Sequence, residues 1–158
     1  MFYYFISIMD GYSRKILDWA LCENMEGINI ELLVARVKEK YPEAKARIIH
    51  DNGKQFISRD FKSLVSLLEL YETASRICHP QSNGKLERFH STLKTEHVRK
   101  TPYFSYEDAK EKMAQWIILK AEKNQGLQNE EKNFILQIST EKLIGCNSST
   151  LNPPYKLS

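Results

Sequence analysis

Two acidic residues, Asp51 and Glu87, stand in contexts that suit metal-ion chemistry, and 35 residues separate them. Asp51 ends the run Ala-Arg-Ile-Ile-His-Asp, and Glu87 follows a polar segment that begins at His79. A pair of carboxylates held on a strand end and on a helix provides the ligands that a divalent cation needs for phosphoryl chemistry on nucleic acid. This chemistry usually needs a third acid as well.

The strand that would carry Asp51 spans residues 47–50 and contains Ile48 and Ile49. A buried strand here would place the Asp51 carboxylate at its C-terminal end, where open α/β sheets place their sites. Asp-Asn-Gly is also an ordinary turn sequence, so this segment alone leaves both interpretations open.

The element that would carry Glu87 is a helix from Lys85 to about Arg99. Its core face has apolar residues at i, i+3 and i+7, namely Leu86, Phe89 and Leu93. Glu87 and Lys94 share the adjacent face, together with Ser91. A surface glutamate among lysines is the alternative. The preceding loop supplies neutral hydrogen-bonding side chains suited to phosphate and sugar contacts, namely Gln81, Ser82 and Asn83.

The other elements alternate between strand and helix patterns. A strand over residues 2–9 and its antiparallel partner over 14–22 are joined by a turn at Asp10-Gly11. Helical spacing predicts helices over residues 28–40, 58–70 and 106–123, and a short strand is expected over 72–75. Residues 140–144 predict a short helix before a loose tail over 146–158. The pattern is that of an α/β protein.

Length and composition fit one globular domain with a sizeable core. The chain has 158 residues and a net charge of +3. Its basic residues gather between Ala74 and Lys100, where six Lys or Arg face two acids. Such a stretch suits a phosphate backbone, and a solvated helix face is the plain alternative.

The cysteines and the apolar segments indicate the cellular compartment in which the protein is expected to act. Cys22, Cys78 and Cys146 are odd in number and far apart, which favours a reducing, cytoplasmic compartment over a disulfide framework or a zinc site. No apolar run reaches the roughly 18 residues of a membrane-spanning helix. The first residues lack the basic start of a signal peptide.

Three segments resemble one known family. Residues 79–96 resemble the third-acid segment, residues 51–56 the second-acid segment, and residues 8–19 the hairpin of the integrase catalytic core. This core defines the DDE superfamily of retroviral integrases and bacterial insertion-sequence transposases. The amino-acid sequences of the three segments most resemble those of the transposases. The 35 residues between Asp51 and Glu87 match the spacing between the second and third acids in the family's D-35-E signature. The resemblance covers roughly residues 3–120.

The resemblance implies an RNase H-like α/β fold, a mixed sheet flanked by helices, over residues 1–125, followed by a divergent extension over 126–158. It further implies two Mg²⁺ or Mn²⁺ ions, with Asp51 as second acid, Glu87 as third acid and Lys94 as a contact to the DNA end. The other candidate DNA-binding residues are Gln81, Asn83, Lys85 and Arg88. The implied partners are mobile-element ends, target DNA and further copies of the chain, because such enzymes work as multimers.

The resemblance also predicts a strand that this sequence does not show. The family's first acid lies on a central strand, between the hairpin and the strand that ends at Asp51, whereas Met1 already begins inside the hairpin. We therefore expect a fold that lacks the first strand, with unpaired backbone groups on both neighbours unless another chain fills the gap or the sheet rearranges. Asp10 and Asp18 are not expected to replace the first acid.

Two functions follow from this sequence. The first is DNA transposition or integration by metal-dependent polynucleotidyl transfer, impaired because the first acid is absent. The second is a non-catalytic remnant that binds DNA or a partner transposase.

Overall fold

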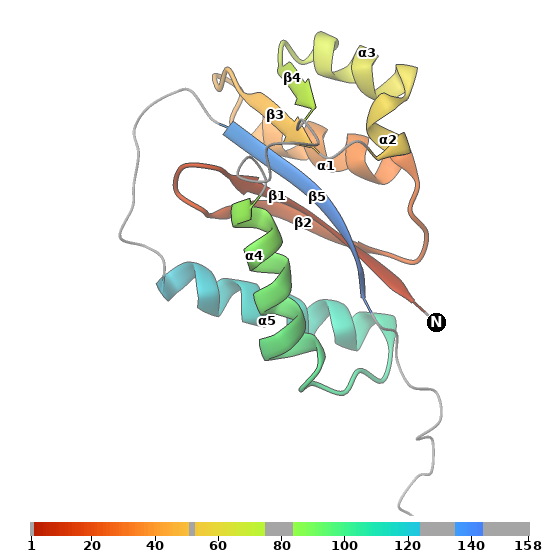
Figure 1. The fold of residues 1–158 in the computed structure, drawn as a ribbon, viewed down its shortest axis with the longest axis vertical. Coiled ribbons are helices and arrows are strands. Elements are labelled where there is room, and N and C mark those ends of the chain that lie inside the picture. Colours follow the sequence, from red (N-terminus) through yellow and green to blue (C-terminus); the bar gives the residue numbers. More distant parts are fainter. Residues whose placement is uncertain (1, 51–52, 75–83, 124–134, 144–158) are drawn as a thin grey trace, which may run out of the picture.

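The computed structural model describes residues 2–50, 53–74, 84–123 and 135–143, which form a five-stranded sheet with helices on both faces (Figure 1). In chain order the elements are β1 (Tyr3–Asp10), β2 (Ile16–Cys22), α1 (Gly27–Lys40), β3 (Arg47–His50), α2 (Lys54–Ile57), α3 (Arg59–Leu67), β4 (Tyr71–Ala74), α4 (Gly84–Thr92), the π-helix η2 (Leu93–Val98), α5 (Tyr106–Lys123) and β5 (Ile135–Leu143). The predicted α/β class is confirmed. The division expected after residue 125 lies outside the described residues.

The strands lie in the order β2-β1-β5-β3-β4, so the last strand of the described chain lies at the centre of the sheet (Figure 1). β5 pairs antiparallel with β1 along its length, from Tyr3–Leu143 to Asp10–Leu136. On its other side it pairs parallel with β3, as β3 does with β4. β5 therefore lies between the hairpin and the strand that leads to Asp51, where the family's first strand was expected.

This arrangement corrects the helix predicted over residues 140–144, because Thr140 to Leu143 belong to β5. The backbone donors and acceptors of β1 and β3 need partners, and β5 supplies them from within the same chain. The described residues include no strand that precedes the hairpin.

The hairpin between β1 and β2 turns through Asp10 and Gly11, as predicted. The Asp10 carboxylate accepts hydrogen bonds from the backbone N–H groups of Tyr12 (3.2 Å) and Ser13 (3.0 Å) and from the Ser13 hydroxyl (2.6 Å). Gly11 donates its N–H to the Ile135 carbonyl at 2.6 Å, and a Cβ on Gly11 would lie only 3.2 Å from that oxygen. Asp10 thus stabilises the turn, and Gly11 permits β5 to approach it.

Helices α1, α2 and α3 cover one face of the sheet (Figure 1). Ser58 caps α3, with its hydroxyl accepting from the Phe61 N–H at 3.1 Å. The buried residues of this cluster, here called the α1-side core, are Ile6, Ile8, Ile30, Leu33, Val34, Val37, Ala46, Ile48, Phe56, Phe61, Val65, Leu70, Leu136 and Ile138.

Helices α4, η2 and α5 cover the opposite face. The predicted helix over 106–123 is confirmed as α5, whereas the helix expected from Lys85 to Arg99 changes from α to π geometry at Leu93. The buried residues of this cluster, here called the α4-side core, are Tyr3, Phe5, Leu21, Leu93, Ala109, Met113, Ile117 and Leu143. Within the described ranges, no helix combines the length and apolar character needed to cross a membrane.

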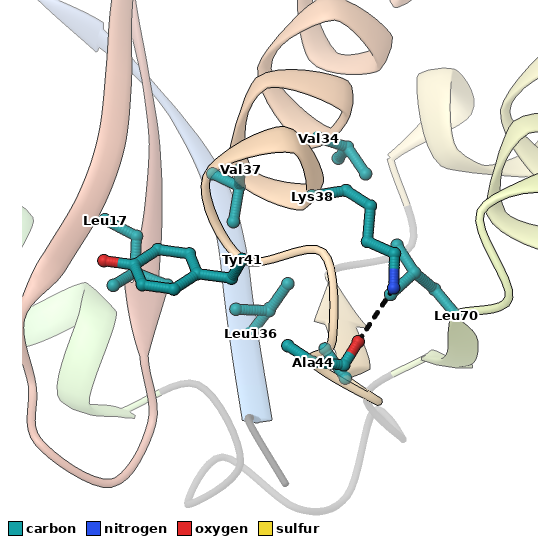
Figure 2. A pocket seen from close by; sticks show the side chains of 9 residues that line it. Leu17, Val34, Val37, Lys38, Tyr41, Ala44, Leu70 and Leu136 are labelled. Carbon is teal, nitrogen blue, oxygen red and sulfur yellow. Dashed lines mark hydrogen bonds between the residues drawn. The ribbon is translucent and has the colours of Figure 1, made fainter. Parts of the chain in front are cut away.

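A small apolar pocket opens on the α1 side of the sheet (Figure 2). Val34 and Val37 of α1 and Leu136 of β5 contribute to its lining, and Lys38 Nζ donates to the Ala44 carbonyl oxygen at 3.0 Å. Because α4 lies on the other face of the sheet, this pocket takes no part in the site that contains Glu87.

Candidate functional site

Helix α4 lies along β5 and runs in the same direction (Figure 1). At its start, Lys85 Nζ donates to the carbonyl of Gly11, whose N–H in turn bonds to the Ile135 carbonyl at the start of β5. Two residues beyond its end, in η2, Lys94 forms an ion pair with Glu141 near the end of β5. Glu87 therefore lies above the first half of β5.

Apolar packing fixes the rotation of α4 about its axis. Leu86, His90 and Leu93 are buried against the sheet, and Phe89 is half-buried. Glu87 is exposed, as is expected for a residue adjacent to the buried stripe. Glu87 and Lys94 are two helical turns apart and lie on the same edge of the helix, the edge from which Lys94 reaches β5.

A buried polar network joins α4 to both strands beneath it. Ser7 Oγ of β1 lies 2.8 Å from His90 Nε2, and His90 Nδ1 lies 3.6 Å from Glu141 Oε2 of β5, which also holds Lys94. A serine, a histidine and a carboxylate in series resemble a nucleophilic relay, but Ser7 has no exposed surface and His90 only 2%. The network therefore holds α4 in place, since no substrate reaches the serine.

The Glu141 carboxylate is the most strongly shifted acid of this network. Its hydrogen bond to His90, followed by that to Lys94, lowers its pKa from 4.5 to about 2, against the opposing effect of partial burial. Because the folded-state pKa lies below that of the unfolded chain, the carboxylate stabilises the fold above pH 4.5. This contribution is lost as the pH falls from there towards 2.

We expect Glu141→Gln to be less stable than the parent chain above about pH 5, by an amount that shrinks as the pH falls towards 2. Urea denaturation between pH 2 and 6 measures this difference. Glu43→Gln, at an exposed loop position, is the matched control and should show no such pH dependence. A difference between Glu141→Gln and the parent that stays constant over this range would contradict the assignment.

The end of β3 is held by a second buried histidine. His50 Nε2 lies 3.0 Å from Glu72 Oε1 on β4, and its ring stacks on Phe56 with centroids 4.5 Å apart. This fixes the backbone one residue before Asp51. Asp51 itself lies outside the described residues, as do Gln81 and Asn83.

The structure describes the other four predicted site residues, and all four lie on α4 and η2. Glu87 and Arg88 are exposed, Lys85 is exposed but directs its ammonium to Gly11, and Lys94 is half-buried by its pair with Glu141. Arg88 thus presents its charge to solvent, while the charges of Lys85 and Lys94 are engaged within the chain.

No replacement for the first acid emerges from the part of the chain that the structure describes. No group of three or more His, Cys, Asp or Glu residues there could hold a metal ion. Asp18 forms a bidentate pair with Arg36, with distances of 2.8 and 2.9 Å, and lies 3.5 Å from Lys40. Asp18 therefore joins β2 to α1.

Comparison with known protein families and sequences identifies a family profile and several relatives that are similar to this chain. Two sequence profiles described as integrase core domain match residues 1–83 and 73–119. The chain is 27% identical over 99 residues to an uncharacterized protein of insertion element IS136 from Agrobacterium fabrum, covering 58% of this chain and 51% of that protein. It is 23% identical over 110 residues to the transposase for insertion sequence element IS904 from Lactococcus lactis, covering 69% and 44%. The chain thus spans about half the length of the curated relatives it matches.

Solved structures show the same fold. The chain is similar to a chain in the structure of the simian T-cell lymphotropic virus intasome in complex with PP2A regulatory subunit B56 gamma, with a TM-score of 0.59 and 18% identity over 83% of this chain and 46% of that one. It is also similar to the catalytic domain of Mos1 mariner transposase, with a TM-score of 0.54 and 15% identity over 67% and 57%. The expected RNase H-like fold is confirmed.

Proposed function

This chain belongs to the integrase core domain family, and we propose that it acts on DNA in transposition through a nucleotidyl-transfer site that is incomplete. The observation that supports this proposal most is the placement of Glu87. Helix α4 holds this exposed carboxylate over β5, the strand paired with β3, and β3 ends one residue before Asp51. Helix α4, which carries Glu87, and β3, which ends before Asp51, thus both adjoin β5.

The basic side chains of α4 and η2 are the proposed DNA contacts. Arg88 is exposed and suits a phosphate oxygen, because its guanidinium donates two parallel hydrogen bonds. Lys85 and Lys94 would have to leave the Gly11 carbonyl and the Glu141 carboxylate to reach a phosphate. Gln81 and Asn83 remain proposed contacts of the loop before α4. The DNA partners would be mobile-element ends and target sites, bound by an assembly of several copies.

Asp51 and Glu87 are the proposed ligands of Mg²⁺ or Mn²⁺. Carboxylates suit these ions, and proteins often hold Mg²⁺ with one or two carboxylates plus substrate phosphates. Two acids fit one such ion and fall short of a bridged pair. A bound ion would polarise the phosphodiester and lower the pKa of a coordinated water or hydroxyl. The chain's own part is to present the Glu87 carboxylate from a firmly packed helix and to orient the phosphate through Arg88.

Salt-dependent DNA binding tests the proposed DNA surface. We expect the chain to bind duplex DNA with an affinity that falls as salt rises, and Arg88→Ala to lose about one phosphate contact, which lowers the slope of log K against log salt by about 0.9. Fluorescence anisotropy over a salt series measures both quantities. Arg59→Ala, an equally exposed arginine on α3 at the other face of the sheet, is the matched control. Equal losses in the two variants, or affinity that ignores salt, would contradict the proposal.

A non-catalytic DNA-binding or transposase-interacting remnant is the second candidate, favoured because the described residues contain no cluster of three or more His, Cys, Asp or Glu that could hold a metal ion. Both candidates predict weak or no strand transfer by this chain alone. A cleavage assay on element-end DNA with Mn²⁺ separates them: residual cutting that Glu87→Gln abolishes supports the impaired enzyme. Complete inactivity with intact DNA binding supports the remnant, and robust cutting would refute the expected impairment.

A further inference from the structure

The turn of the β1–β2 hairpin presents exposed side chains that belong to neither core. Residues 12–15 are here called the hairpin tip. Tyr12 is 59% exposed, and Arg14 and Lys15 are exposed as well. No residue that the structure describes forms an ion pair or a hydrogen bond with the Arg14 guanidinium or the Lys15 ammonium. Within the described ranges, the hairpin tip thus carries two unpaired positive charges and an exposed aromatic ring.

The backbone of the hairpin tip is held in one conformation by Asp10. Its carboxylate accepts hydrogen bonds from the Tyr12 and Ser13 N–H groups and from the Ser13 hydroxyl. The Asp10 main chain closes the turn, because its carbonyl accepts from the Arg14 N–H at 2.8 Å and its N–H donates to the Lys15 carbonyl at 2.9 Å. The exposed side chains therefore project from a preorganised turn, which reduces the entropy lost when a ligand binds.

The residue at position 14 is not the type that the turn itself favours. Arg14 has a φ of +61°, in the left-handed region of backbone conformation. Glycine and asparagine adopt this conformation at a lower cost than a residue with a long side chain. Turn geometry therefore does not account for the arginine. Residues held in uncommon backbone conformations gather at functional sites, which directs attention to its charge.

The hairpin tip lies beside the first turn of α4 (Figure 1). Lys85 Nζ donates to the carbonyl of Gly11, the residue directly before the tip. Arg88 follows Lys85 by three residues, so the two are neighbours on the helix surface, and Arg88 is exposed. The Lys85 side chain thus joins the helix edge that carries Arg88 to the turn that carries Arg14 and Lys15.

We infer that the hairpin tip is a second DNA contact beside α4, in which Arg14 and Lys15 bind phosphates and Tyr12 stacks on an unpaired base. This inference rests on the proposed function for the role of Arg88. Cations next to an aromatic ring suit a single strand, because the backbone is charged and every base offers a face for stacking. Phosphates of one strand follow each other about every 3.4 Å along the axis, so a strand held by Arg88 can continue to the hairpin tip.

Arg14→Asn combined with Lys15→Gln in the full chain tests the phosphate contacts. Asparagine tolerates the left-handed backbone, so the turn is kept while two charges are lost. On a duplex with a single-stranded overhang, we expect the slope of log K against log salt to fall by about 1.4–1.8, the value for two phosphate contacts. Fluorescence anisotropy over a salt series measures the slope, and a thermal melt that matches the parent shows that the fold is kept.

Two further variants support this test. Arg59→Gln combined with Lys62→Gln removes the same charge from exposed positions of α3, on the other face of the sheet, and should leave the slope unchanged. Lys15→Gln alone leaves the left-handed position intact and should lower the slope by about half as much as the double variant.

Tyr12→Ala tests the stacking contact. We expect it to weaken binding to the overhanging duplex by about five- to 150-fold, the usual effect of removing one stacked aromatic ring. Affinity for a blunt duplex of the same sequence should not change. Tyr12→Phe keeps the ring and should bind both duplexes as the parent does.

The outcomes separate this inference from the proposed function. If the hairpin and α3 double variants changed the slope equally, or if Tyr12→Ala bound the overhanging duplex as the parent does, the inference would be overturned. Salt-dependent binding by the parent that Arg88→Ala weakens would still support the proposed function. A parent chain that binds neither duplex would reject the proposed function together with the hairpin contact.

Discussion

A chain that ends at residue 134 is expected to remain unfolded. It would lack β5, which pairs with all eight residues of β1 and all four of β3. Without it the sheet divides into a hairpin and a two-stranded parallel pair, and two-stranded sheets are marginally stable at best in water. Circular dichroism and the dispersion of an amide NMR spectrum measure the loss directly.

The size of the effect follows from burial. Leu136, Ile138 and Leu143 are at most 3% exposed and fill cores on both faces of the sheet. Truncating one buried leucine or isoleucine to alanine costs about 2–5 kcal/mol. Losing three such side chains approaches the whole stability of a domain, about 5–15 kcal/mol.

A chain that ends after Leu143 is the control and should fold cooperatively, because it keeps β5. A peptide spanning residues 135–143, added to the shorter chain, should restore folding in a concentration-dependent manner, since binding to the folded state shifts the equilibrium. Cooperative folding of the chain that ends at residue 134 would show that β5 is dispensable and would contradict the central placement of this strand.

The sequence predicted best those elements whose pattern is local. Helices α1 and α5 carry long 3.6-residue periodicities, and the hairpin has an Asp-Gly turn flanked by apolar runs. The short helix α2 was missed because four residues after a turn sequence give no periodicity to read. The π geometry of η2 was missed because it does not alter the residue types that a helix favours.

β5 was missed for a different reason. The polar stretch Ser-Thr-Glu-Lys before Leu143 suits a helix start as well as a strand, and nothing local decides between them. The need for paired backbone groups correctly predicted that the centre of the sheet must be filled or rearranged, but it did not identify the segment. The alternation of Leu136 and Ile138 with Gln137 and Ser139 is the signal that a strand prediction could have used.

The candidate site shows the same division. Helical spacing predicted that Glu87 and Lys94 share one face, and both lie on the continuous helical segment formed by α4 and η2. The contacts that surround these two residues could not be predicted from the sequence, because the partners are far apart along the chain. Ser7 lies 83 residues from His90, and Glu141 lies 47 residues from Lys94. Contacts over such separations depend on the strand order, which residue types alone did not give.

Phe5→Ala is expected to lower the free energy of unfolding by about 3–5 kcal/mol, the usual cost of truncating a fully buried phenylalanine. Phe5 stacks on Trp19 with centroids 5.7 Å apart, meets the His90 ring edge-on at 5.7 Å and contacts Phe89 at 6.5 Å. It is therefore the surface on which α4 rests. Urea denaturation measures the loss, and Phe104→Ala, at a position that is 74% exposed, should change stability by less than about 0.5 kcal/mol.

Phe61→Ala separates a general loss of stability from a loss of support for α4. Phe61 is equally buried but belongs to the α1-side core, where it contacts His50 and Phe56. The two tryptophans of the chain, Trp19 and Trp116, both border the α4-side core. In the folded state, Phe5→Ala should therefore shift tryptophan emission to longer wavelength and speed amide exchange within α4, whereas Phe61→Ala should do neither.

If both variants changed emission and exchange alike, the two cores would respond as one unit, and Phe5 would have no special part in placing Glu87. If only Phe5→Ala changed emission and amide exchange, the position of Glu87 would depend on packing in the α4-side core alone. Substitutions in the α1-side core would then lower stability without displacing the Glu87 carboxylate, because side chains on opposite faces of β5 are connected only through its backbone.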